Sequence, residues 1–190
     1  MGNLRLGLVG CGAIAQWHAT ALQHAQRTTV TACVDVVSAN ANKLAEITGG
    51  AACSSIAEAL EIGVDALAIL VPHHLHEDLV TQALEAGVHV ALEKPMAPTL
   101  EACERILATA ARHPDRVFML TENAQYWPEV VMAQKLIAEG AIGKLVTARS
   151  WHNFGITPEF YPSDESWRFQ QAAAGGGVAL DTGSHWMRPL

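Results

Sequence analysis

The chain has 190 residues, of which 50% are hydrophobic and 16% are charged, and its formal net charge is -7. A chain of this length can bury one good core and part of a second, while an acidic balance without a basic cluster argues against nucleic acid as a partner. No apolar run approaches the roughly 20 residues of a membrane span, so a membrane partner is not expected. The N-terminus lacks an export pattern and the four cysteines lack CxxC spacing, which is typical of reduced, mostly buried thiols in a cytoplasmic protein.

Residues 4–15 read LRLGLVGCGAIA, a short apolar run that leads into closely spaced glycines. This pattern predicts a buried strand at 4–9, a tight turn and a helix at 13–25, the arrangement that binds the pyrophosphate of a dinucleotide. Gly10 permits the turn, Gly12 lets the backbone approach the phosphates, and Ala15 allows close packing of helix and strand. Phosphates favour a helix N-terminus, so Gly10, Gly12, Ala13 and Ile14 are predicted cofactor contacts. The alternative is a turn that binds no ligand.

A second apolar run, 28–34, ends in Asp35, roughly 20 residues after the glycine turn. An acid at this spacing accepts hydrogen bonds from the ribose hydroxyls of the adenosine and repels a 2'-phosphate. No Arg or Lys lies between Asp35 and Asn42, so the sequence predicts NAD in preference to NADP. The alternative is a solvated acid that closes a strand.

Strand-like and helix-like segments continue to alternate up to residue 121. Further strands are predicted at 51–53, 66–71, 89–92 and 117–121, with helices at 40–47, 56–61, 75–86 and 100–112. Gly87 fits the C-terminal cap of the third of these helices. Near-continuous apolar strands separated by helices predict an α/β fold with a doubly wound parallel sheet covered on both faces. In 100–112 the apolar side chains share one helical face, formed by Leu100, Cys103, Ile106, Leu107 and Ala110.

The pattern changes after Glu122. A helix is predicted at 128–139 and a strand at 144–152, whereas 153–171 is irregular and a further helix follows the glycines at 175–177. We therefore predict a dinucleotide-binding domain over 1–122 and the incomplete start of a second, α+β domain over 123–190. Long irregular segments inside compact domains are often functional.

Glu93, Lys94 and Pro95 directly follow the predicted strand 89–92. Ligands bind open α/β sheets at the carboxyl ends of their strands. Pro95 also disfavours a helical conformation at Lys94, which is therefore held extended near the cofactor. Glu93 and Lys94 are predicted cofactor contacts, and the alternative for Lys94 is an ordinary surface lysine.

The same sheet edge is predicted to carry Val71, Pro72 and three histidines at positions 73, 74 and 76. The histidines lack cysteine or carboxylate partners at a recognisable metal-binding spacing. We expect no metal site, and we interpret Val71, Pro72 and His76 as cofactor contacts.

Two later pairs of residues could act on a substrate. If the segment around Asp181 and His185 is helical, their four-residue spacing places carboxylate and imidazole on one face, where the imidazole could remove a hydroxyl proton. The alternative is a helix-surface pair. Trp167 and Arg168 could stack on a sugar and donate to its hydroxyls, or equally pack the long irregular segment.

Four segments, 6–22, 71–97, 137–145 and 167–185, together resemble the glucose-fructose oxidoreductase / inositol dehydrogenase (Gfo/Idh/MocA) family. The resemblance covers essentially the whole chain, and the combination of EKP with GGG...DxGSH is much more specific than the glycine turn. It implies a Rossmann domain and a nicotinamide-dependent oxidoreductase that acts on a secondary hydroxyl of a sugar, cyclitol or related polyol.

The resemblance also implies roles for individual residues. Lys94 matches the EKP lysine and would stabilise a developing alkoxide, while His185 would take the hydroxyl proton and Asp181 would orient its ring. These three are the predicted catalytic residues. The family often has a cis bond at the EKP proline, which implies a cis Lys94-Pro95 bond. Predicted substrate contacts are Tyr126, Trp167, Arg168 and His185, and Gln125 replaces an arginine that is common in the family.

Family members usually continue well beyond the position of Leu190, building an open sheet that lines the substrate site and often mediates oligomerisation. We therefore expect a truncated chain whose full-length form is a homo-oligomer. Two other functions fit the family: an NAD-dependent glycoside hydrolase with no net redox change, and a non-catalytic, dinucleotide-binding regulatory module.

Overall fold

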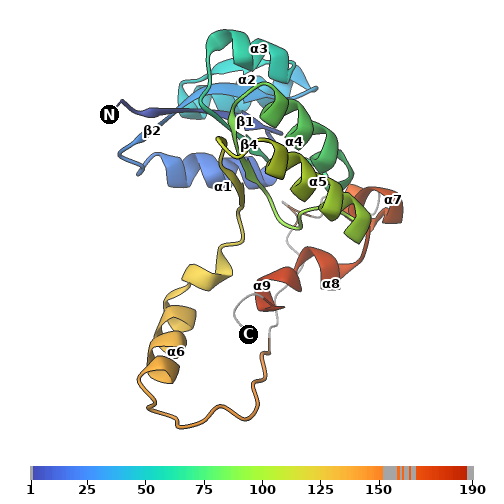
Figure 1. Ribbon diagram of the computed structural model, residues 1–190. Coiled ribbons are helices and arrows are strands. Elements are labelled where there is room, and N and C mark those ends of the chain that lie inside the picture. Colours follow the sequence, from blue (N-terminus) through green and yellow to red (C-terminus); the bar gives the residue numbers. More distant parts are fainter. Residues whose placement is uncertain (1, 152–157, 159, 161–162, 164–165, 188–190) are drawn as a thin grey trace.

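The computed structural model describes residues 2–151, 158, 160, 163 and 166–187. Its centre is a six-stranded sheet in the order β3-β2-β1-β4-β5-β6, in which every neighbouring pair is parallel (Figure 1). The strands are β1 Leu4–Val9, β2 Thr28–Val34, β3 Ala51–Cys53, β4 Ala66–Ile69, β5 His89–Leu92 and β6 Phe118–Leu120. The strand order reverses between β1 and β4, which is the doubly wound arrangement that the sequence predicted.

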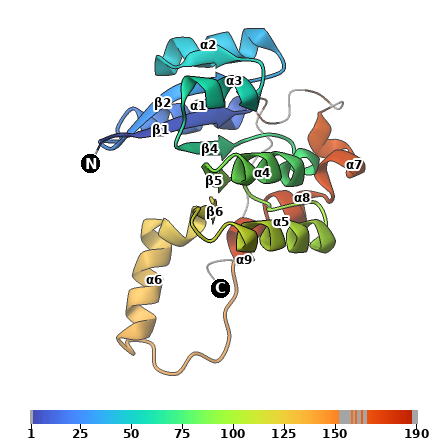
Figure 2. The same ribbon diagram turned by 45° about the horizontal axis from the view of Figure 1, so that its top comes forward.

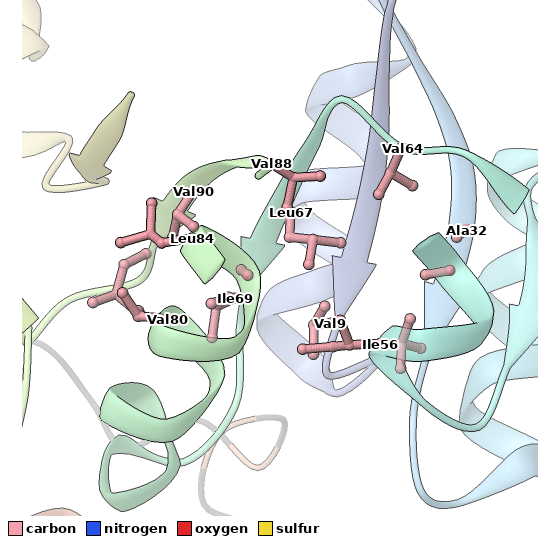
Figure 3. Close-up of a cluster of buried hydrophobic side chains, with 14 of the residues drawn as sticks. Val9, Ala32, Ile56, Val64, Leu67, Ile69, Val80, Leu84, Val88 and Val90 are labelled. Carbon is pink, nitrogen blue, oxygen red and sulfur yellow. The ribbon is translucent and has the colours of Figure 1, made fainter. Parts of the chain in front are cut away.

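Helices cover both faces of this sheet. They are α1 Ala13–Leu22, α2 Ser38–Thr48, α3 Ile56–Ile62, α4 His76–Glu85 and α5 Leu100–Arg112. Helices α1 and α2 pack through Ala15, Ala19 and Leu44 against one face, and α3, α4 and α5 pack against the other. Figure 3 shows part of the second cluster, with Ile56 of α3 and Val80 and Leu84 of α4. The four cysteines are free, and three of them are buried, as predicted.

Local chemistry explains where these helices begin and end. The side chains of Ser55 and Thr99 accept hydrogen bonds from the backbone at the starts of α3 and α5, which satisfies N–H groups that have no partner inside the helix. Gly49 and Gly87 follow α2 and α4 with φ of 78° and 77°, a left-handed conformation that ends a helix.

The buried face of α5 agrees with the prediction at Ile106, Cys103 and Ala110, which lie in or pack against the core, and differs from it at Leu100 and Leu107. Ala102, Ile106 and Thr109 are buried, whereas Leu100 and Leu107 are 71% and 50% exposed. The side chains that face the sheet start at Ala102 and recur after four and then three residues. Leu107 lies between two of these positions and is therefore rotated away from the sheet.

The chain leaves the sheet after β6 through η2 (Ala124–Tyr126) and α6 (Pro128–Ala138), which buries none of its residues and extends away from the sheet (Figures 1 and 2). The predicted strand at 144–152 is wrong over 144–151, where no strand forms and Val146 is 88% exposed. A strand needs a neighbour for its backbone hydrogen bonds, and this segment has none among the described residues. His152 and most of the predicted irregular segment lie outside the described residues.

The chain then returns to the sheet through short elements: η3 Trp167–Phe169, α7 Gln171–Ala174, α8 Val178–Asp181 and α9 Ser184–Met187. Helix α7 contacts η1 (His73–Leu75), which lies between β4 and α4. No helix in the described part of the chain is long and apolar enough to cross a membrane.

Candidate active site

The glycine turn lies between β1 and α1. Gly10 has φ +89°, and a Cβ there would lie 2.7 Å from the carbonyl oxygen of Leu70, so a larger residue would strain the turn. Gly12 precedes α1, and a Cβ there would meet no atom of the described residues within 4 Å. Among the described residues, no side chain caps this helix start, so its first N–H groups are available to an anion.

A cavity of about 400 Å³ opens beside the turn. It is lined by Cys11, Gly12, Ala13, Gln16, Trp17, Asn40 and Lys43. The carboxylate of Asp35 accepts hydrogen bonds of 2.8 Å from the backbone N–H groups of Cys11 and Val37, which fixes it at the turn. An open glycine approach, an uncapped helix start and a nearby carboxylate fit a dinucleotide. Lys43 directly follows Asn42, the end of the stretch without Arg or Lys on which the prediction of NAD is based, and sequence reasoning missed it as a residue of this cavity.

His76 lies at the predicted sheet edge, where its side chain is enclosed. It is 0% exposed, with Nε2 3.0 Å from the carbonyl oxygen of Val71 and Nδ1 3.1 Å from that of Pro95. Burial lowers its pKa. The ring therefore joins the loops after β4 and β5, and the direct contact with a cofactor that the sequence predicts for His76 stays a prediction. Val71 and Pro72 remain half-buried at the sheet edge.

The other two histidines of this segment form hydrogen bonds with backbone carbonyl oxygens of α7. Nδ1 of His73 lies 3.0 Å from the carbonyl oxygen of Ala174, and Nδ1 of His74 lies 3.3 Å from that of Ala173. Trp167 packs edge-on against the buried ring of His73 at 4.7 Å between centroids. Trp167 thus has a packing role in this arrangement. Across the described residues, no group of three or more His, Cys, Asp or Glu side chains could hold a metal ion.

Lys94 lies at the carboxyl end of β5, and its bond to Pro95 is cis, as the resemblance implied. Its Nζ donates to the carbonyl oxygen of Asp181 at 2.6 Å and to Oδ1 of the same residue at 3.1 Å. Arg168 donates to Oδ2 of Asp181 at 3.3 Å. Burial by itself would raise the pKa of Asp181, but the charge and hydrogen bond of Lys94 and the charge of Arg168 keep it below its usual value.

Glu93 is fixed in a similar way. Its Oε2 accepts a hydrogen bond of 2.8 Å from the backbone N–H of Lys94, and its Oε1 lies 3.1 Å from Nε2 of His18 on α1. The glycine-turn helix and the loop after β5 are therefore joined at the predicted cofactor site.

The structure brings His185 to a different carboxylate from the one expected. Helix α8 ends at Asp181 and α9 begins at Ser184, so Asp181 and His185 do not share one continuous helix. Nδ1 of His185 lies 2.8 Å from Oε1 of Glu122. Sequence reasoning missed Glu122, although its position two residues after β6 places it at the edge where ligands bind.

The arrangement thus unites groups from distant parts of the sequence. Lys94, Arg168 and Asp181 form one charged cluster, and His185 and Glu122 form a second. Tyr126, a predicted substrate contact, is 72% exposed. A cation to stabilise negative charge and an imidazole to take a proton lie at the same end of the sheet as the glycine turn.

Comparisons with known proteins agree with this description. Residues 4–121 match the family model described as "Oxidoreductase family, NAD-binding Rossmann fold", and residues 130–188 match the "GFO/IDH/MocA C-terminal domain". The 1,5-anhydro-D-fructose reductase of Ensifer adhaerens is 32% identical over 187 residues, which cover 95% of this chain and 54% of the reductase. The chain therefore spans about half the length of this relative.

Two solved structures are similar. Aldose-aldose oxidoreductase from Caulobacter crescentus, complexed with glycerol, has a TM-score of 0.86 and 25% identity over 98% of this chain and 56% of its own. Scyllo-inositol dehydrogenase from Lactobacillus casei, with bound NAD(H) and scyllo-inositol, has a TM-score of 0.70 and 27% identity over 74% of this chain and 42% of its own. With the family match over residues 4–121, these findings show that the chain belongs to the Gfo/Idh/MocA family of oxidoreductases with an NAD-binding Rossmann domain.

Proposed function

We propose that the chain belongs to an NAD-dependent dehydrogenase that transfers hydride between the nicotinamide and a secondary hydroxyl of a sugar, cyclitol or related polyol. The observation that carries the proposal is the position of Lys94 and His185. Each is paired with a carboxylate at the carboxyl edge of the sheet, where the glycine turn and its cavity also lie. The names of the relatives, which include a sugar reductase and an inositol dehydrogenase, support the same class of substrate.

The cofactor site uses residues at the ends of four strands. Gly10, Gly12, Ala13 and Ile14 would hold the pyrophosphate, and Asp35 would accept hydrogen bonds from the ribose hydroxyls. Val71, Pro72, Glu93 and Lys94 would contact the nicotinamide half. When bound, NAD supplies the hydride acceptor. We further propose a preference for NAD over NADP, because the Asp35 carboxylate would repel a 2'-phosphate.

Lys94 and His185 would act on the substrate hydroxyl. An ammonium has three donors, and Lys94 uses two on Asp181, which leaves one for the substrate oxygen. As the C–H bond breaks and its electron pair leaves with the hydride, the hydroxyl proton passes to the imidazole of His185. The positive charge of Lys94 stabilises the oxygen while negative charge develops on it.

Asp181 would act differently from the role implied by the resemblance. Its carboxylate holds Lys94 and Arg168 together, which fixes the ammonium while partly neutralising two neighbouring cations. Arg168, Trp167 and Tyr126 would complete the substrate side.

The wider expectations also remain proposals. We propose a cytoplasmic homo-oligomer in the full-length form, with a small-molecule substrate and with neither nucleic acid nor a membrane as partner. The net charge of -7 supports the exclusion of nucleic acid. The division into domains at 1–122 and 123–190 stays a prediction.

A substrate screen tests the proposed activity. The purified chain is incubated with NAD and, separately, myo-inositol, scyllo-inositol, glucose, xylose and a panel of methyl glycosides, and NADH and free sugar are both measured. NADH formation with a polyol or sugar is the expected result. Free sugar released without NADH would indicate the glycoside hydrolase instead. NADH binding without any turnover would indicate the non-catalytic module.

A further inference from the structure

Glu122, which contacts His185, is not among the residues that the sequence singled out. It is 7% exposed, and its Oε1 accepts hydrogen bonds from the backbone N–H of Ala124 at 2.7 Å and from Nδ1 of His185 at 2.8 Å. Its Oε2 is buried and has no hydrogen-bond partner among the described residues. One carboxylate oxygen therefore accepts hydrogen bonds both from the imidazole and from the backbone of its own loop.

The ring of His185 is held from a second direction. Trp127 stacks on it with 6.1 Å between centroids and 29° between planes, and Trp127 in turn packs edge-on against Trp186. The carboxylate fixes one edge of the imidazole while an indole covers one face. The ring has little freedom to rotate.

Chemistry assigns the proton on this ring. An ionised carboxylate only accepts hydrogen bonds, so Nδ1 of the neutral ring must carry the hydrogen, and Nε2 is left with a lone pair. Within the described part of the chain, no hydrogen bond reaches Nε2 of His185. Nε2 is thus the nitrogen that can accept a proton from a substrate.

A purely structural role would not need a charge here. A glutamine oxygen could also accept from Ala124 and His185, and glutamine would avoid the cost of burying a charge, with its amide nitrogen in place of the unpartnered oxygen. The negative charge gains value only when the ring is protonated, because it then pairs with an imidazolium.

We propose that Glu122 is a positioning residue that fixes the Nδ1–H tautomer of His185 and stabilises the imidazolium formed when Nε2 takes a proton. The tautomer assignment rests on the hydrogen bond between Nδ1 and Oε1 and on the carboxylate being the acceptor. Its consequence for turnover rests on the proposed function.

The test reads the tautomer directly. Long-range ¹H–¹⁵N spectra of histidine-labelled protein identify which ring nitrogen of His185 carries the hydrogen, with His185→Asn used to assign the signal. We expect the Nδ1–H form in the wild type and in Glu122→Gln, and a mixture of tautomers in Glu122→Ala. The exposed Glu129→Gln on α6 is the matched control and should leave the signal unchanged. An Nε2–H tautomer in the wild type, or an unchanged Nδ1–H form in Glu122→Ala, would overturn the proposal.

Kinetics separate the charge from the hydrogen bond. In Glu122→Gln we expect kcat to fall about tenfold or more, as part of the roughly 10²- to 10⁴-fold that a general base contributes, with the Kd for NADH unchanged. Equal kcat in Glu122→Gln and the wild type would refute the stabilisation of the imidazolium. If the wild type turns over no substrate, the proposed function fails, while the spectra still decide the role of Glu122.

Discussion

Replacing the two glycines of the turn should produce opposite defects. In Gly10→Ala the left-handed backbone costs roughly 1–2 kcal/mol. The new Cβ, 2.7 Å from the carbonyl oxygen of Leu70, adds about 1–3 kcal/mol because a backbone neighbour cannot easily yield. The expected loss of about 2–5 kcal/mol is a large part of the roughly 5–15 kcal/mol that stabilises a domain.

Gly12→Ala is the matched control for stability. Its Cβ would meet nothing within 4 Å, so the loss is about 1 kcal/mol or less, as for an unfavourable residue before a helix. The same Cβ would project toward the phosphates. An overlap of about 1–3 kcal/mol corresponds to NADH binding weakened by about 5- to 150-fold.

Urea denaturation followed by circular dichroism measures the first effect, and titration of NADH fluorescence measures the second. The reasoning predicts that Gly10→Ala lowers the free energy of unfolding while Gly12→Ala mainly lowers affinity. Equal destabilisation by both substitutions, or wild-type NADH affinity in Gly12→Ala, would refute the assignment of the two glycines.

Three further outcomes follow from the structure. Asp35→Ala should narrow the ratio of NAD to NADP affinity, measured by isothermal titration of both cofactors, and an unchanged ratio would remove Asp35 from cofactor selection. Ile106→Ala should lower the free energy of unfolding by about 2–5 kcal/mol because the side chain is 0% exposed, and half-exposed Leu107→Ala should cost about 1 kcal/mol or less; similar losses would contradict the described face of α5. Burial lowers the pKa values of His73 and His76 in the folded chain. As the pH drops below about 6.5, these histidines are therefore protonated in the unfolded chain before they are protonated in the folded chain, and the free energy of unfolding should fall. Urea denaturation between pH 7 and pH 5 measures the free energy of unfolding at each pH. A free energy of unfolding that does not change over this range, in the wild type and in His73→Phe alike, would exclude the effect.

The sheet could be predicted from the sequence because its determinants are local. Apolar runs with turn residues at their ends predict β1, β4 and β5, and the Gly10 turn needs a conformation that glycine readily adopts. The cis bond before Pro95 followed from family resemblance alone.

The pairing of the charged residues could not be predicted because it is non-local. The spacing of Asp181 and His185 suggested one helix, but the chain turns at Gly183, which packs so closely on Ala179 that a side chain there would overlap its backbone. Glu122 meets His185 across 63 positions of sequence, a contact that depends on how the last segment returns to the sheet.

The most direct test of the proposed chemistry is Lys94→Met, with NADH formation and NADH binding measured on the same samples. The wild type should form NADH from at least one polyol or sugar. If Lys94 stabilises the developing alkoxide as proposed, its loss should reduce kcat by about 10²-fold or more while NADH binding stays nearly intact. Undiminished turnover in Lys94→Met would contradict the proposed role of the lysine and of the site built around it.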